Sequence, residues 1–282
     1  MSVPMATLLF FALVIGLFLL PLVPALREIR QRIDAHALPV PDDGRMSPRY
    51  FADRFRTLIR ARLAGPLEET RAAGLTLRGR IDGGEGFVVL GPQAARLSPS
   101  DSTPVDVMVL ASGDLSVDDE RRALREVYVD GRLEAGERVI ARAVLVENDA
   151  TFGHDLTVLR WVHANGDLRI GPRARLHGRA TAAHALFLGA PCHFERLHAS
   201  RIEFGAPVAI DPPTNERTEL RAADLHARAL ADDHRILIRD DVEVPPDSRI
   251  RGDLVVRGRL RIGARCLVEG SIDARSIEID ER

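Results

Sequence analysis

A repeat of 17 to 18 residues is the feature that most limits how this chain can fold. Five phrases, LEAGERVIA, ATFGHDLTV, LRIGPRARL, LFLGAPCHF and IEFGAPVAI, place an apolar residue just before a turn-forming glycine and further apolar residues a few positions later. Near the C-terminus VEVPPDSRI, LRIGARCLV and IEIDER repeat the spacing, with Pro245, Gly263 and Asp280 in the glycine position. The glycines of the first five phrases are 17, 18, 18 and 16 residues apart and are Gly136, Gly153, Gly171, Gly189 and Gly205. A fixed internal period indicates an array of stacked structural units.

One repeat has room for three short strands but not for two helices. Val, Ile, Leu and Arg alternate with period two between the glycines, which is the pattern of strands with one buried face. We therefore expect an all-β fold, a β-solenoid whose coils each lay three strands around a triangular core, with glycine at the corners. The apolar side chains expected in this core include Leu168, Ile170, Leu188, Phe204, Leu260, Ile262, Val268 and Ile272.

The repeat is interrupted between Ala209 and His234 by a segment rich in proline and charge. We assign 210–235 as an insertion or hinge between a solenoid at 74–209 and C-terminal coils at 236–282. The segment either loops out of one continuous stack or separates two solenoids. Three coils at most form a thin independent core, which favours one continuous stack.

Two segments have the pattern of short helices. Residues 49–63, RYFADRFRTLIRARL, place apolar side chains at helical spacing within a basic juxtamembrane region at 27–73. This amphipathic helix could lie on a bilayer with its arginines among the headgroups, or pack against one end of the solenoid, which we favour. Residues 116–127, SVDDERRALREV, have the pattern of a capped helix. A serine precedes three acidic residues, and Leu124 and Val127 share a helical face.

The N-terminus carries an uncharged run of 22 residues, Met5–Leu26. This is the length that a helix needs to cross roughly 30 Å of hydrocarbon, so we predict a transmembrane anchor at 1–26 with its span at about Ala6 to Val23. A signal peptide starts with a basic region, whereas here the first basic residues follow the run. They are Arg27, Arg30 and Arg32. By the positive-inside rule the body is predicted to be cytoplasmic and the N-terminus outside, with a cleaved signal peptide as the alternative.

Composition agrees with a cytoplasmic body in a bacterium. Nine arginines against five acidic residues lie between Arg27 and Arg62, a balance that suits an anionic cytoplasmic leaflet. The chain has no lysine, which suggests a GC-rich bacterial genome. Two cysteines, Cys192 and Cys266, are too few for a disulfide framework and suit a reducing compartment.

Reactive side chains do not form a recognised motif. Four histidines lie close together in sequence, near Cys192, without the paired spacing of a zinc site. They are His177, His184, His193 and His198. Asp240 and Asp241 are adjacent, and neighbours in a strand point to opposite faces, so they cannot readily flank one bond. With no GxSxG, phosphate loop or dinucleotide fingerprint either, we predict no catalytic residue, cofactor or metal site.

One enzyme class remains as an alternative. LRIGARCLVEGSI and LRIGPRARLHG contain the I-G-x-x-x-x-[LV] phrase of left-handed hexapeptide-repeat acyltransferases. The phrase does not run in the unbroken sixes that build that solenoid. If the chain were such an enzyme, His177 would be the first base to test.

The cadence of two segments resembles that of the bactofilins, a family of bacterial polymer-forming cytoskeletal proteins. The segments are IRGDLVVRGRLRIGARCLVEGSIDARSIEI at 250–279 and WVHANGDLRIGPRARLHGRATA at 161–182. The resemblance implies a right-handed β-helix that assembles end to end without nucleotide, often at the membrane, as a scaffold. The anchor, the long N-terminal region and the insertion at 210–235 depart from the family pattern.

We therefore expect a membrane-tethered scaffold and no enzyme. Its partners would be the membrane, other copies that associate through the solenoid ends, and another bactofilin-like or envelope protein, with no nucleic acid. The helix at 49–63 is expected to cap one end of the stack.

Overall fold

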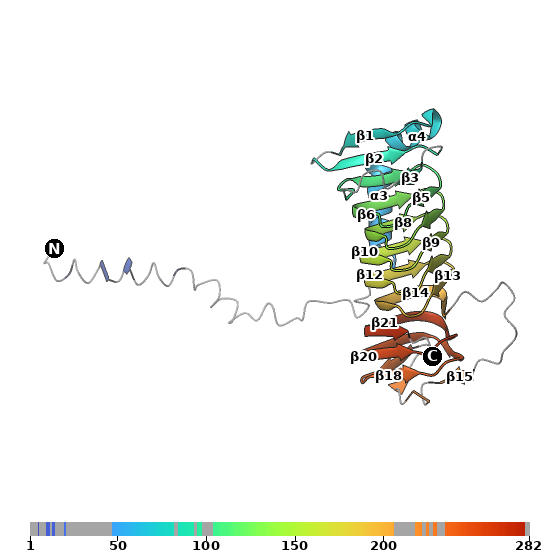
Figure 1. Ribbon diagram of the computed structural model, residues 1–282. Helices are drawn as coiled ribbons and strands as arrows, with labels where there is room; N and C mark the ends of the chain where they lie inside the picture. The colour runs from blue at the N-terminus through green and yellow to red at the C-terminus, as the bar shows by residue number, and fades with distance from the viewer. Residues whose placement is uncertain are drawn as a thin grey trace. The chain divides into compact units, whose positions relative to one another are not determined.

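The computed structural model describes residues 47–81, 84–92, 95–97, 104–205, 218–221, 224–225, 228–229 and 235–279, with a few isolated positions between 5 and 20. The chain divides into two units, Met1–Met46 and Ser47–Arg282. The fold that follows is that of the second unit, whose strands are stacked in Figure 1.

Two helices and 21 strands form the described part of this unit. The helices are α3 (Tyr50–Arg62) and α4 (Ala64–Ala73). The strands are β1 (Leu77–Arg80), β2 (Gly86–Leu90), β3 (Arg96–Leu97), β4 (Met108–Ala111), β5 (Leu115–Val117), β6 (Arg122–Val129), β7 (Leu133–Ala135), β8 (Ile140–Val146), β9 (Ala150–Phe152), β10 (Thr157–Ala164), β11 (Leu168–Ile170), β12 (Arg175–Ala182), β13 (Ala185–Leu188), β14 (His193–Phe204), β15 (Thr218–Leu220), β16 (Arg228–Ala229), β17 (Arg235–Ile238), β18 (Val242–Val244), β19 (Ser248–Arg251), β20 (Asp253–Ile262) and β21 (Leu267–Ile279).

The predicted all-β solenoid is confirmed, with about 9 turns. Strands pair in parallel with their copies one coil away, so that Thr157 of β10 lies between Ile140 of β8 and Arg175 of β12, at steps of 17 and 18 residues. Short strands such as β7, β9 and β11 alternate buried, exposed, buried. The sequence repeat is therefore the coil length, and its period-two alternation is the inward and outward alternation of side chains.

The strands of the N-terminal stack form three rows, which we call faces A, B and C. Face A contains β2, β4 and the second halves of β6, β8, β10 and β12, whose first halves form face C. Face B contains β3, β5, β7, β9, β11 and β13. The long strands turn from face C to face A at a register shift, as between Val158 and Trp161 of β10. Strand β14 pairs with both β12 and β13 and closes this stack.

An apolar column fills the interior from the first coil to the last. All eight side chains assigned to the core from the sequence lie in it, and each is at most 3% exposed. Figure 1 shows the strands around this column, from β2 at one end to β18 at the other.

The C-terminal coils join the column in the reverse chain direction. Strand β21 pairs antiparallel with β14, which places Leu197 opposite Ile272 and Phe194 opposite Ile277. Next to β21 lie β20 and then β17 and β18, so the last coil of the chain touches the N-terminal stack and the earlier coils point away from it (Figure 1). The core is continuous across this junction. Neither alternative for 236–282 anticipated this reversal, because a periodic pattern fixes spacing along the chain and not the direction in which two stacks meet.

Helix α3 matches the helix predicted at 49–63, but it lies along face A and does not cap an end. Its inner side chains follow helical spacing and are Ala52, Phe55, Ile59 and Leu63. They pack on outward apolar side chains of face A, namely Phe87, Val89, Met108, Leu110, Tyr128, Ala143, Leu145 and Trp161. These outward positions are apolar over several consecutive coils, and the helix removes them from water.

The prediction of a helix at 116–127 is wrong. This segment forms the end of β5, a corner and most of β6, with Leu115 and Val117 buried in one coil and Ala123 and Val127 in the same core. The acidic run that resembled a helix cap forms the corner, where Glu120 has φ 59°. Strand pairing on both sides outweighs the local helical pattern.

Among the residues that the structure describes, no helix combines the length and apolar character needed to cross a membrane. The predicted span at Ala6 to Val23 lies almost wholly outside those residues, as do Arg27, Arg30 and Arg32 and most of 210–235.

Candidate interaction sites on the solenoid

The predicted turn glycines form a stacked corner. Gly136, Gly153, Gly171 and Gly189 each follow a strand of face B directly. A Cβ atom added to Gly153 would lie 2.8 Å from the carbonyl carbon of Gly136, and one added to Gly171 would lie 2.7 Å from that of Gly153. The corner backbones are too close for any side chain. Gly205, with φ 112°, and Gly263 end strands in the same way near the junction and in the C-terminal coils.

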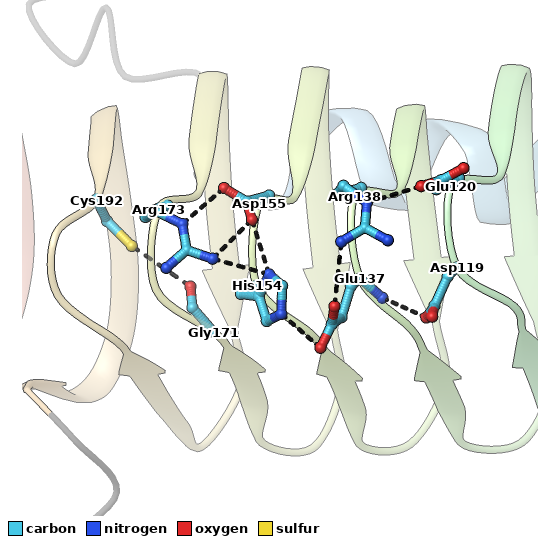
Figure 2. Close-up of polar contacts among 9 residues, drawn as sticks. All are labelled: Asp119, Glu120, Glu137, Arg138, His154, Asp155, Gly171, Arg173 and Cys192. Atoms are coloured by element: carbon cyan, nitrogen blue, oxygen red, sulfur yellow. Dashed lines mark hydrogen bonds and ion pairs between the residues drawn. The ribbon is translucent and has the colours of Figure 1, made fainter.

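The same corner holds charged residues of alternating sign in the left-handed conformation, and three of them lie two residues after Gly136, Gly153 and Gly171. Glu120, Arg138, Asp155 and Arg173 have φ of 59°, 53°, 59° and 60° in successive coils. Figure 2 shows them in a row along the stack. Arg138 Nε lies 2.9 Å from Glu120 Oε1, and Arg173 Nη2 lies 2.8 Å from Asp155 Oδ2. Each basic residue thus pairs with the acidic residue of the preceding coil.

His154 extends this charged row sideways. Its Nδ1 lies 2.7 Å from Asp155 Oδ2, and its Nε2 contacts Glu137 (Figure 2). Hydrogen bonds from Arg173 and then His154 hold the pKa of Asp155 well below its usual range. The row is exposed, so it fixes the register of neighbouring coils more than it adds stability.

A second corner uses aspartate to join coils. Asp149 Oδ1 accepts a hydrogen bond from the backbone N–H of Asp167 at 2.9 Å, and Asp241 Oδ1 accepts one from Arg259 at 2.6 Å. Gly166 allows the first contact, since a Cβ atom there would lie 2.1 Å from Asp149 Oδ1. Asp241 is therefore a corner residue.

The histidines grouped in sequence are not grouped in space as a metal site. His177 is exposed on β12, His184 in the turn before β13 and His193 at the start of β14. His198 is half-buried in β14. Within the described ranges no cluster of three or more His, Cys, Asp or Glu could hold a metal ion. Cys192 is buried beneath the corner, and burial raises the pKa of its thiol to about 11.

A buried polar chain joins α3 to face A. Arg56 Nε lies 2.7 Å from Glu147 Oε1, and Asn165 also donates to Glu147. The ring of His163, which is 1% exposed, lies 3.0 Å from Asn165 Oδ1 and 2.7 Å from Thr181 Oγ1. Burial lowers the pKa of His163. The sequence prediction missed this chain, although His163 and Thr181 are one repeat apart and continue the outward row of Leu110, Tyr128 and Leu145 on face A.

The two ends of the column differ in character. At the N-terminal end an open depression of about 950 Å³ is lined by the edge of the core, where Val88, Leu90 and Leu97 are only 8 to 9% exposed. Arginines line it, and they include Arg78, Arg80, Arg96 and Arg125. At the other end β15 and β16 already pair with β19 and β17, and among the strands that are described β18 pairs only with β20. Both ends thus present coil edges that a further strand or coil could cover.

Comparison with known proteins found no match, whether among family models, curated proteins or solved structures. The bactofilin resemblance therefore stays a prediction, based on the cadence of 161–182 and 250–279.

Proposed function

We propose that this protein is a membrane-tethered, non-enzymatic scaffold whose bactofilin-like, right-handed β-helix stands at the cytoplasmic face of a bacterial inner membrane. It self-associates through the ends of its stack or docks an envelope or bactofilin-like partner there. The observation that carries the proposal is the junction between β14 and β21.

At this junction two coil stacks meet end to end within one chain. Backbone pairing runs from His193 to Glu203 on one side and from Leu267 to Glu278 on the other. Between the paired strands, Leu197 and Ile272 are each at most 2% exposed. An end coil of this solenoid can therefore be covered by another coil through strand pairing and apolar contact alone.

The junction covers one end of the N-terminal stack and one end of the C-terminal coils. The opposite end of each stack is not part of this junction. Among the strands that are described, β3 beside the depression and β18 each have one unpaired edge, and these edges are the surfaces proposed for a second copy or partner. Confinement on a membrane raises the effective concentration of these ends, so weak contacts there suffice for assembly. The uncharged run Met5–Leu26 supplies that confinement in the proposal.

Sedimentation velocity and electron microscopy of residues 45–282 test self-association. We expect oligomers that grow with concentration, and a Leu97→Asp variant that remains monomeric because a carboxylate interrupts the core edge that lines the depression. Because Leu97 is buried, thermal unfolding must show that this variant still folds. Thr151→Asp, a change at an exposed mid-stack position of face B, is the control. A wild-type fragment that stays monodisperse and monomeric at high concentration would count against assembly.

Deletion of residues 1–26 tests the tether. The shortened protein is expected to leave the membrane fraction and to assemble more weakly in cells.

A C-terminal reporter active only in the periplasm tests orientation, and periplasmic activity would contradict the cytoplasmic assignment. A clear thermal shift with coenzyme A thioesters would favour the acyltransferase alternative, with His177 the first residue to replace.

A further inference from the structure

Large apolar side chains that remain exposed on the described solenoid unit gather on two adjoining elements. Helix α3 contributes Phe51 and Leu58, which are 41% and 38% exposed. The corner where face C turns into face A contributes Val107, Leu124 and Leu159, at 36%, 37% and 42%. We call these five residues the Phe51–Leu159 surface. Leu75, which is 71% exposed, lies outside it, just before β1.

The orientation of α3 brings the two elements together. Arg56 points to Glu147 at the edge of face A next to face B. The opposite side of the helix carries Phe51, whose ring lies 5.7 Å from the Arg179 guanidinium. Arg179 stands at the edge of face A next to face C, where β12 has its register shift. Phe51 and Leu58 are seven residues apart, two helical turns, so both face the corner that carries Leu159.

Trp161 connects the helix to that corner. Its ring centroid lies 5.9 Å from that of Phe55, and it follows Leu159 by two positions on β10. It is the single tryptophan of the chain. Trp161 is 9% exposed and lies beneath α3, so it is an optical probe directly under this surface.

Arginine is the main charged residue among these apolar side chains. Arg125, Arg142 and Arg160 lie on the corner, with Arg54 on the helix and Arg179 beside it. Three acidic residues balance the arginines of the corner itself, and one of them, Glu85, lies 3.9 Å from Arg125. Asp106 pairs with Arg125 at 3.0 Å, and Glu126 lies 3.8 Å from Arg142. Arg54 and Arg179 add positive charge to this balanced corner, so the surface is both apolar and net positive.

The chain arrives at the solenoid beside this surface. Ser47, at the start of the unit, accepts a hydrogen bond from Arg179 through its carbonyl oxygen at 3.4 Å. Twenty residues, 27–46, separate it from the uncharged run. They span at most roughly 70 Å when fully extended. A run held in a bilayer, as the proposed function requires, therefore keeps this surface within reach of the headgroups.

We propose that the Phe51–Leu159 surface rests on an anionic lipid bilayer. Arginine guanidinium groups would contact lipid phosphates, while the phenyl ring and the leucine side chains enter the boundary between headgroups and acyl chains. Apolar side chains separated by arginines suit this boundary better than the core of a protein interface, from which charge is depleted. The proposal rests on the membrane tether but makes the solenoid itself a second membrane contact.

Vesicle binding of residues 47–282 tests the proposal without the anchor. This fragment is a compact unit with its own core, so it is expected to fold alone. It should sediment with vesicles of phosphatidylcholine mixed with roughly one-third phosphatidylglycerol, and much less with phosphatidylcholine alone. Brominated acyl chains in the anionic vesicles should quench Trp161 fluorescence.

Matched variants assign the binding to the surface. Combined Phe51→Ser, Leu58→Ser and Leu159→Ser should weaken binding to anionic vesicles by at least roughly tenfold. Arg160→Glu alone should weaken it by about fivefold. Leu75→Ser, which removes an exposed leucine elsewhere, should leave it unchanged. Unaltered thermal unfolding of each variant shows that the fold is intact.

The outcomes separate this proposal from the tether. If residues 47–282 do not bind anionic vesicles while the full chain stays in membranes, the proposed lipid contact is overturned and the proposed tether stands. If the fragment binds vesicles but the full chain does not require residues 1–26 for membrane association, the tether fails and the surface stands. Binding that Leu75→Ser weakens as much as the triple variant also overturns the proposal. So does a triple variant that changes self-association and not vesicle binding, since the surface would then be a protein interface.

Discussion

Arg173 and Asp155 occupy the same corner in neighbouring coils, 18 residues apart, with φ of 60° and 59° and a guanidinium-to-carboxylate distance of 2.8 Å. A pair related in this way needs the two coils in one register, because a slip of a single residue would move both side chains away from the corner. Arg265 and Asp247 repeat the relationship in the C-terminal coils, with φ of 58° at both. The charged corner is therefore a register device.

Substitution at Arg173 should reveal the cost of the left-handed conformation. We expect Arg173→Val to lower the free energy of unfolding by about 1–2 kcal/mol relative to Arg173→Gly, because a β-branched residue is strained at φ 60°. Urea denaturation monitored by circular dichroism measures the difference. Equal stability of the two variants would contradict the assigned corner conformation.

Gly166→Ala should destabilise the aspartate corner. Its new methyl group would lie 2.1 Å from Asp149 Oδ1, so the hydrogen bond to the N–H of Asp167 must break. We expect a loss of about 1–3 kcal/mol in unfolding free energy, and a smaller loss when Asp149→Ala is already present. Gly65→Ala is the control, since no atom lies within 4 Å of its added Cβ in α4. It should be neutral or stabilising.

Acidification should weaken the contact between α3 and face A. Burial lowers the pKa of His163 below 6.5, so the folded state favours the neutral ring. Its contribution is complete above the unfolded pKa and is lost as the pH falls from 6.5 through the folded pKa. Unfolding free energies at about pH 7.5 and pH 5 should differ less in His163→Gln than in the wild type. An equal pH dependence in the two proteins would remove His163 from this role, leaving His198, whose pKa is also lowered, as the next histidine to test.

The junction should behave as core. Ile272→Ala is expected to cost about 2–5 kcal/mol, because Ile272 is 1% exposed and lies opposite Leu197. Arg275→Ala, at an exposed position of the same strand, should change stability by less than about 0.5 kcal/mol. Thermal and urea unfolding measure both.

Removal of the C-terminal coils should leave β14 uncovered and make the protein self-associate through it. Truncation after Gly205 uncovers the paired edge of β14 together with Phe194 and Leu197. We expect the truncated protein to form dimers or larger oligomers in light scattering, at concentrations where the intact body is smaller. A monomeric truncated protein would show that β14 does not need a covering coil.

Local pattern was a poorer guide at 116–127 than the repeat was elsewhere. The Ser-Val-Asp-Asp-Glu phrase satisfies the rules for a helix N-terminus, yet Leu115, Val117 and Ala123 already face the core at strand spacing. A cap is a short-range preference of about 1 kcal/mol, and parallel pairing with β7 and β8 on the next coil outweighs it.

The coil length, the inward residues and the corner glycines could be predicted from the sequence alone, because each coil repeats one set of short-range steric requirements at a constant interval. The return of the final coils onto β14, the position of α3 along face A and the place of His163 in a buried polar chain became visible only in the folded chain. Those outcomes depend on contacts between residues far apart in the chain, such as Arg56 with Glu147, whose partners no periodicity can specify.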